Sequence, residues 1–194
     1  MTRYTDQIST LFPTWNGEIA YVIGNSRELT GFNFRLLDSG LTIGVDLAGV
    51  YAESDITVSV SDPVIINKYT MLEAYAENGG FCVLALSAEY TNRVPAVSGA
   101  LYVDKVQNRG LFLSDHTLSA QSSETAALSV AIASGAKCIY LLGFSEAFGF
   151  MGNSSQTEQF QNLNVFLCTD EPETKSGMFK MVSLTNLMEH VKCQ

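Results

Sequence analysis

The stretch Ile19-Ala20-Tyr21-Val22-Ile23-Gly24-Asn25-Ser26-Arg27-Glu28-Leu29 decides the fold that this sequence predicts. Its first five residues are apolar and include three β-branched side chains, which is typical of a strand covered on both faces of a parallel sheet. A sharp polar turn follows at Gly24. Open α/β sheets bind ligands beyond the carboxyl ends of their strands, and a glycine lets backbone N–H groups approach a phosphate closely. The turn therefore predicts either a phosphate-binding loop or a plain strand-to-loop connection.

The composition is that of a globular chain of ordinary domain size. The 194 residues are 46% hydrophobic and 16% charged, so we expect one domain over 1–194 with a substantial core. With 11 Lys and Arg against 20 Asp and Glu, the formal net charge is −9, and no basic run appears. Because nucleic-acid backbones are bound by clustered cations, duplex DNA or RNA is not an expected partner. A small anionic ligand is compatible with this charge, and Arg27 and Arg35 would supply local positive charge.

Cysteine spacing and hydropathy point to a cytoplasmic protein without a membrane partner. The four cysteines, Cys82, Cys138, Cys168 and Cys193, form no CxxC pair and have no histidine at metal-ligand spacing. Three of them lie in apolar runs, so we expect reduced core thiols. The start of the chain has no apolar core of the signal-peptide type, and no segment approaches the roughly 18 apolar residues of a membrane helix.

Strand and helix patterns alternate after the first turn, which predicts an α/β fold with a mostly parallel central sheet flanked by helices. Strands are expected at 19–23, 41–45, 55–62, 81–86, 100–103, 138–142 and 164–168. Helices are expected at 33–40, 68–78, 124–134 and from 185 onward. Within the single domain, 17–148 would form the core around the site, 149–157 a lid, and 158–194 a C-terminal strand and helix.

Two of these strands end in an acidic residue, Asp46 and Asp62, and a parallel sheet would bring both to the same edge. Carboxylate oxygens suit Mg²⁺, so the pair would hold the ion between ligand phosphates, with Asp62 also a candidate catalytic residue. The alternative is that both aspartates cap turns. His116 precedes a serine-rich turn and is a candidate general base, although a lone histidine is more often structural.

Taken in order, several stretches resemble segments of one superfamily. Residues 22–29 resemble a GNGPSL-type loop, and residues 122–128 together with 135–143 resemble the pattern S-G-x-x-A-L-x-L-A-x-x-L-G-x-K-x-I-x-L-L-G. The superfamily is the MptE-like group of 6-hydroxymethylpterin pyrophosphokinases, which includes phage-encoded proteins of unassigned function and has bacterial lipooligosaccharide sialyltransferases as distant relatives. The resemblance covers about two-thirds of the chain, in the stretches 22–29, 42–46, 60–63, 122–128, 135–143, 166–169 and 177–179.

The resemblance implies a Rossmann-like nucleotide site. Gly24 and Asn25 would lie at the phosphates and Asp46 near the ribose or base, facing a serine pair on the opposite wall. Family members transfer a diphosphate from ATP or a sugar from a nucleotide sugar, and both reactions need charge neutralised at a phosphate leaving group, here with Mg²⁺. The residues implied to bind the nucleotide are Gly24, Asn25, Ser26, Arg27, Asp46, Ser122 and Ser123.

The chain also departs from the family pattern. Ser26-Arg27-Glu28 stands where the family has Gly-Pro-Ser, which puts a carboxylate beside the expected phosphate position. Ser145 stands where an acidic residue is frequent, and neither histidine matches the sialyltransferase base. Two functions therefore stay open, beside the third possibility of a structural subunit whose acidic surface keeps it soluble. One is a Mg-dependent nucleotide transferase, and the other is a non-catalytic, phage-type protein of the host cytoplasm that binds a nucleotide-type ligand or a host protein. A homo-oligomer is compatible with either.

Overall fold

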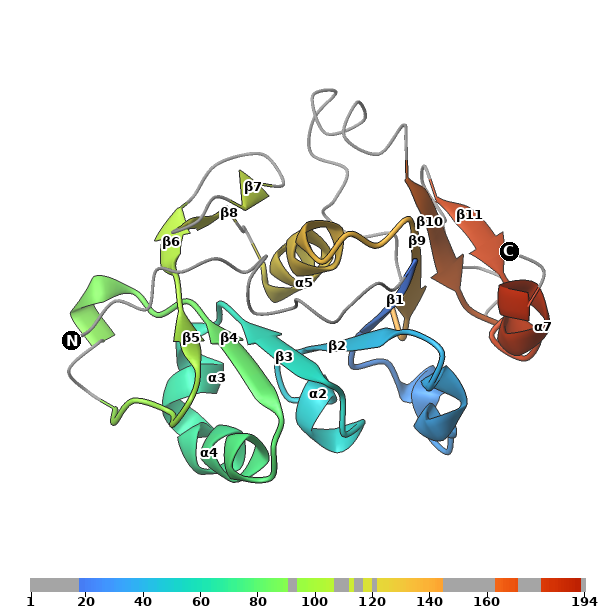
Figure 1. Cartoon of the computed structure of the whole chain (residues 1–194). Coiled ribbons are helices and arrows are strands. Elements are labelled where there is room, and N and C mark those ends of the chain that lie inside the picture. Colours follow the sequence, from blue (N-terminus) through green and yellow to red (C-terminus); the bar gives the residue numbers. More distant parts are fainter. Residues whose placement is uncertain are drawn as a thin grey trace.

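The chain folds around an eight-stranded sheet in which every neighbouring pair is parallel. The computed structural model describes residues 18–90, 94–106, 112–113, 117–119, 122–144, 163–170 and 179–192. The arrangement is α/β and Rossmann-like, which confirms the predicted fold class (Figure 1). The strands are β1 (Ile19–Ile23), β2 (Leu41–Val45), β3 (Ile56–Ser59), β4 (Phe81–Leu84), β5 (Leu101–Tyr102), β9 (Cys138–Leu142), β10 (Asn164–Cys168) and β11 (Lys180–Val182).

Strand β1 lies inside the sheet at the point where the strand order changes direction. The order is β11-β10-β9-β1-β2-β3-β4-β5, so the chain first moves outward from β1 through β5 and then returns to place β9 on the other side of β1. Tyr21 of β1 is in register with Thr42 on one side and Tyr140 on the other. Ligands of open α/β sheets bind beyond the carboxyl ends of the strands at such a switch point.

Helices cover both faces of the sheet (Figure 1). Helix α5 (Ser123–Ala133) lies on one face, where it shares a core with Val22 and Ile43. Alternate residues of the same strands, such as Tyr21 and Tyr140, belong to the core of the opposite face. Burial on both faces explains why the strands are continuous apolar runs in the sequence. The helices of the opposite face are α2 (Ala48–Tyr51), α3 (Asp62–Asn67), α4 (Tyr69–Glu77) and α7 (Leu187–Lys192).

Helix α5 begins at a defined cap and packs closely on the sheet. The Ser122 hydroxyl accepts a hydrogen bond from the backbone N–H of Thr125, and the Thr125 hydroxyl oxygen accepts one from the backbone N–H of Ser122, which together form a capping box. Ala126, Ala127 and Ala131 are fully buried. Small side chains thus allow α5 to cross β1, β2 and β3, with its first residue at the carboxyl edge of the sheet.

Short elements account for most differences from the sequence-based expectation. Helices α2 and α3 and strand β11 have four, six and three residues, too few to show a period in the sequence. The segment 33–40 forms a 3-10 turn, Phe34–Leu37, instead of an α-helix. A second sheet, of order β6-β8-β7, consists of β6 (Asp104–Val106), β7 (Phe112–Leu113) and β8 (Thr117–Ser119).

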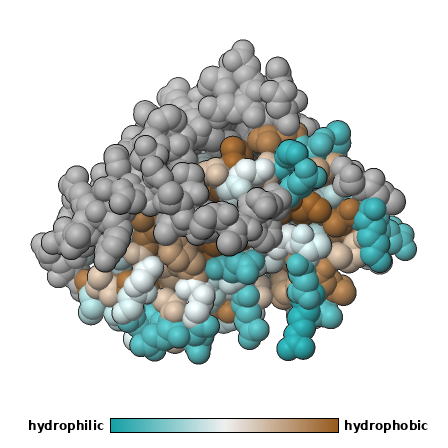
Figure 2. Space-filling model, viewed as in Figure 1, coloured by the Kyte–Doolittle hydropathy of each residue, from teal (hydrophilic) through white to brown (hydrophobic). Residues whose placement is uncertain are grey.

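Hydrophilic side chains gather along the lower rim of the face shown in Figure 2, where α2, α3 and α4 lie in Figure 1. No helix within the described residues is long and apolar enough to cross a membrane. The expected lid, 149–157, lies outside the described residues.

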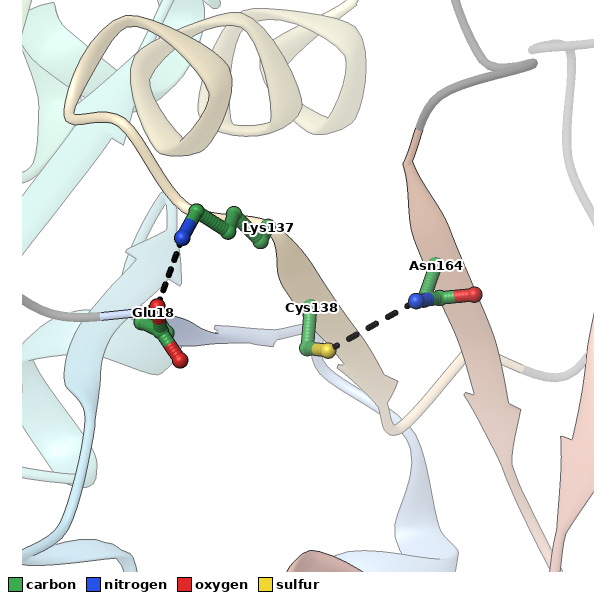
Figure 3. A network of polar contacts seen from close by, with 4 residues as sticks. All are labelled: Glu18, Lys137, Cys138 and Asn164. Atoms are coloured by element: carbon green, nitrogen blue, oxygen red, sulfur yellow. Dashed lines mark hydrogen bonds and ion pairs between the residues drawn. The ribbon is translucent and has the colours of Figure 1, made fainter. Parts of the chain in front are cut away.

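At the amino edge of the sheet, polar contacts join β1, β9 and β10 (Figure 3). Lys137 Nζ lies 2.6 Å from Glu18 Oε1, and Asn164 Nδ2 donates to Cys138 Sγ at 3.9 Å. The Glu18 carbonyl also accepts hydrogen bonds from the backbone N–H groups of Lys137 and Cys138. Because both charged side chains are largely exposed, the ion pair contributes little stability, and the backbone bonds set the register.

A glycine pair sets the distance between α2 and the sheet. A Cβ on Gly44 of β2 would lie 1.9 Å from the Cα of Gly49 in α2. A Cβ on Gly49 would in turn lie 2.3 Å from the Thr57 hydroxyl oxygen of β3. Because neither residue has a side chain, the backbone of α2 can rest directly on β2 and β3, next to the loop that carries Asp46.

Replacing Gly44 with alanine should therefore lower the free energy of unfolding by about 3 kcal/mol, because the added methyl group forces α2 away from β2. Urea unfolding followed by far-UV circular dichroism measures the change. Ala74→Ser, at an exposed position of α4, is the control and should change stability by about 0.5 kcal/mol or less. A Gly44→Ala variant as stable as the wild type would contradict this account of how α2 is held.

Candidate functional site

A cavity of about 380 Å³ lies at the carboxyl ends of β1, β2 and β9. This is the switch point of the strand order, where ligands of open α/β sheets bind. Four residues singled out from the sequence, Gly24, Asn25, Ser26 and Asp46, lie together in its wall. The complete lining is Gly24, Asn25, Ser26, Val45, Asp46, Leu47, Val64, Glu124, Gly143 and Phe144.

Gly24 is where the turns after β1 and β9 touch. Its backbone N–H donates to the Leu142 carbonyl at 2.7 Å, and a Cβ at this position would lie 2.5 Å from the Gly143 carbonyl oxygen. Gly143 itself has a φ of 72°, a conformation that favours glycine. Packing between the two turns therefore requires the glycine that the sequence analysis placed at a phosphate.

The residues after Gly24 form a capped 3-10 turn, Arg27–Leu29. The Ser26 hydroxyl accepts from the backbone N–H of Glu28 at 3.3 Å. The Glu28 carboxylate contacts the end of β10, where its Oε2 accepts from the Thr169 hydroxyl at 2.8 Å. Neither Arg27 nor Glu28 lines the cavity. The Glu28 carboxylate is thus held by the end of β10 and does not form part of the cavity wall.

The backbone of Asp46 is fixed to strand β3. Asp46 directly follows β2 and has a φ of 53°, a left-handed conformation that aspartate tolerates better than most residues. Its backbone N–H donates to the Val58 carbonyl at 2.9 Å, and its own carbonyl accepts from the Thr57 hydroxyl at 2.6 Å. These two contacts hold the residue at the edge of the cavity.

The Asp46 carboxylate is held by two hydroxyl groups on the same oxygen. Its Oδ1 accepts hydrogen bonds from Ser59 Oγ at 2.6 Å and from Ser123 Oγ at 2.7 Å. Within the described part of the chain, no hydrogen bond is made to the other oxygen, Oδ2. Burial raises the pKa of this carboxyl above its ordinary value of 3.8; the two serine hydroxyls oppose the rise, and Glu124 adds to it.

Glu124 is a cavity residue that the sequence analysis did not identify as part of a site. Glu124 could have been identified from the fold topology, because it lies in the first turn of α5, which begins at the carboxyl edge of the sheet next to β2. Within the described residues, the cavity wall holds two carboxylates, Asp46 and Glu124, and no lysine or arginine. Such a wall favours ligand hydroxyl groups or a cation and repels a bare phosphate.

The other predicted site residues lie apart from the cavity wall. Asp62 begins α3, and its two oxygens accept from the Ser87 backbone N–H at 2.8 Å and the Ser87 hydroxyl at 2.6 Å. Ser122 caps α5, and Ser123 reaches the site through Asp46. His116 lies outside the described residues. Among those that are described, no group of three or more His, Cys, Asp or Glu could hold a metal ion.

A second and larger cavity, of about 530 Å³, lies where β2 and β3 begin. Asp55, in its wall, accepts hydrogen bonds from the backbone N–H and the hydroxyl of Thr42, at 2.9 and 2.7 Å. This cavity is at the amino edge, opposite the switch point. Its lining is Phe32, Asn33, Phe34, Arg35, Leu37, Asp38, Gly40, Thr42, Tyr51, Ala52, Glu53 and Asp55.

Comparison with known proteins leaves the functional argument to this geometry. No family model matches the chain, and no curated protein matches its sequence. A function is therefore inferred from two observations. One is the position of the smaller cavity at the switch point, and the other is the buried, hydrogen-bonded carboxylate of Asp46 in its wall.

Replacing Asp46 with asparagine should stabilise the fold at pH 7 by on the order of 1 kcal/mol. A carboxyl whose pKa is raised on folding stabilises the protein while protonated, and this contribution is lost as the pH rises above 3.8. Asparagine carries no charge, keeps an oxygen for both serines and tolerates the left-handed backbone. Urea unfolding at pH 7 and near pH 3 measures the difference, which should vanish at the lower pH.

Asp170 provides a control, because the pKa of its carboxyl is shifted in the opposite direction from that of Asp46. Hydrogen bonds from Ser183 and Thr185 hold the pKa of its carboxyl below 3.8, so its stabilising contribution is present above that pH and is lost as the pH falls. Asp170→Asn should therefore be less stable than the wild type at pH 7. If Asp46→Asn instead destabilised the fold at pH 7 as Asp170→Asn does, the assignment of a costly buried charge to Asp46 would be wrong.

Proposed function

We propose that this protein binds a nucleotide in the switch-point cavity and transfers a phosphoryl, pyrophosphoryl or glycosyl group from it. The observation that carries the proposal is the Asp46 carboxylate, which follows β2 and lines the cavity beside the loop after β1. In nucleotide-binding α/β folds, an acidic residue about 20 positions after the first glycine turn accepts a hydrogen bond from a ribose hydroxyl. Asp46 follows Gly24 at a comparable separation.

The charges in the cavity wall favour one orientation of the nucleotide. Asp46 accepts a hydrogen bond from a sugar hydroxyl, which places the uncharged part of the ligand against the carboxylate. The phosphates then extend past Asn25 and Ser26, whose amide and hydroxyl groups are neutral donors. A bare phosphate next to Asp46 would meet a like charge.

A Mg²⁺ ion bound to the phosphates would supply the positive charge that the described cavity wall lacks. Mg²⁺ is commonly held by one or two carboxylates together with phosphate oxygens and waters, and Glu124 fits that donor set without a larger protein cluster. The ion would neutralise charge on the leaving phosphate. The chain's own residues bind and orient the nucleotide: Asp46 holds the sugar, and the loop after β1 holds the phosphate end.

Isothermal titration calorimetry should detect binding of at least one ligand from a panel of nucleoside triphosphates and nucleotide sugars at millimolar or lower concentration. Affinity for triphosphates should increase with Mg²⁺. Asp46→Asn should weaken binding by about tenfold or more, because the charged acceptor for the sugar hydroxyl is lost. Asp170→Asn, at a residue that does not line the cavity, is the matched control. Absence of binding by every member of the panel at millimolar concentration would contradict the proposal.

The second candidate function is binding without transfer. The composition of the cavity wall favours this function. No lysine or arginine is present among the described lining residues to neutralise the charge that develops on the leaving group of a transfer reaction. A protein of this kind would hold the nucleotide and release it unchanged. Mass spectrometry of the ligand after long incubation with stoichiometric protein separates the two functions, because turnover excludes the second and unchanged ligand favours it.

A further inference from the structure

We infer that Ser59 and Ser123 are positioning residues that hold one oxygen of Asp46, so that the other, Oδ2, is the oxygen that receives the ligand hydroxyl. The inference rests on the proposed nucleotide site. It assigns a role to two side chains that lie outside the cavity wall and act through a third.

Ser123 can direct its proton only toward Asp46. Its hydroxyl oxygen accepts a hydrogen bond from the Val60 backbone N–H at 3.0 Å and donates to Asp46 Oδ1 at 2.7 Å. A serine hydroxyl has a single proton, so the contact with the Val60 N–H fixes which way that proton points. Ser123 is only 4% exposed, and water therefore has little access to compete for the bond.

Ser59 supplies the second donor to the same oxygen. It is the last residue of β3, is fully buried, and donates to Asp46 Oδ1 at 2.6 Å. Two donors on one oxygen, one from β3 and one from α5, oppose rotation of the carboxylate about its bond to Cβ. The backbone of Asp46 is also bonded on both sides to Thr57 and Val58. Only Oδ2 is left for a ligand within the described part of the chain.

This arrangement specifies a ligand that donates a hydrogen bond. An ionised carboxylate has acceptor oxygens only, so Oδ2 pairs with a hydroxyl group and not with a phosphate oxygen. Glu124 of α5, the other carboxylate among the described lining residues, increases the discrimination against an anion. The wild-type protein should therefore prefer ribonucleotides over nucleotides whose sugar lacks the 2′ and 3′ hydroxyls.

The test compares Ser59→Ala and Ser123→Ala with the wild type. The probes are the four ribonucleoside triphosphates and their 2′,3′-dideoxy counterparts, each with Mg²⁺ in a calorimeter. The wild type should bind its preferred ribonucleotide about tenfold more tightly than the dideoxy form, and each alanine variant should lose most of this ratio. Ser87→Ala, which removes a similar hydroxyl from Asp62, is the matched control and should keep the ratio.

A second readout needs no ligand. Carbon-13 NMR of the Asp46 carboxyl, followed with pH, should show a higher midpoint in Ser59→Ala and in Ser123→Ala than in the wild type, by about one pH unit. The reason is that each serine hydroxyl donates a hydrogen bond to the ionised carboxylate of Asp46 and thereby lowers its pKa. Ser123→Thr keeps the hydroxyl group and should return the midpoint toward the wild-type value, which a loss of packing alone would not do.

The outcomes separate the inference from the proposed function. An unchanged Asp46 midpoint in both alanine variants overturns the inference, as does an unchanged ribonucleotide preference in variants that bind. If the wild type binds none of the nucleotides, the proposed function fails, and the carboxyl titration still decides whether the two serines hold Asp46. A lost preference together with a raised midpoint supports both.

Discussion

The hydrogen bond from Ser123 to Asp46 ties the start of α5 to the carboxyl ends of β2 and β3, two strands that also pair directly with each other. Ser123 begins α5, Asp46 follows β2, and the same hydroxyl accepts from Val60 just beyond β3. The carboxyl ends of two strands and the start of a helix are thereby fixed around one side of the cavity. Burying this carboxyl carries a cost, because burial raises its pKa, and the hydrogen bonds from the two serines offset only part of the rise. An ionisable group kept where it destabilises the fold is typical of a functional site.

The fold could be predicted from the sequence because its central strands are buried on both faces. The bounds of β1, β2, β9 and β10 match the apolar runs expected at 19–23, 41–45, 138–142 and 164–168. The helix expected at 124–134 likewise matches α5, Ser123–Ala133, to within one residue at each end. Helices α2 and α3 were not, since elements of four and six residues depend on local packing, such as the contact between Gly44 and Gly49, and not on a repeating pattern.

The site could be predicted in part, for a related reason. Gly24 and Asp46 were expected near one edge because each follows a strand of a parallel sheet, and Asn25 and Ser26 were implied by the resemblance; all four line the cavity. The partners of their side chains could not be identified, because hydrogen bonds between residues far apart in sequence leave no local pattern. Asp62 thus bonds to Ser87, and Glu28 to Thr169, while Glu124 joins the cavity wall.

A comparison of the switch-point cavity with the cavity at the amino edge offers the most direct test of where this protein binds its ligand. Backbone amide chemical shifts should be recorded during titration with the nucleotides of the panel and Mg²⁺. The account predicts changes concentrated in 24–26, 45–47, 143–144 and at Glu124, around the switch-point cavity. Changes confined to 32–40 and 51–55, around the cavity at the amino edge, would contradict it, as would the absence of any change at millimolar nucleotide.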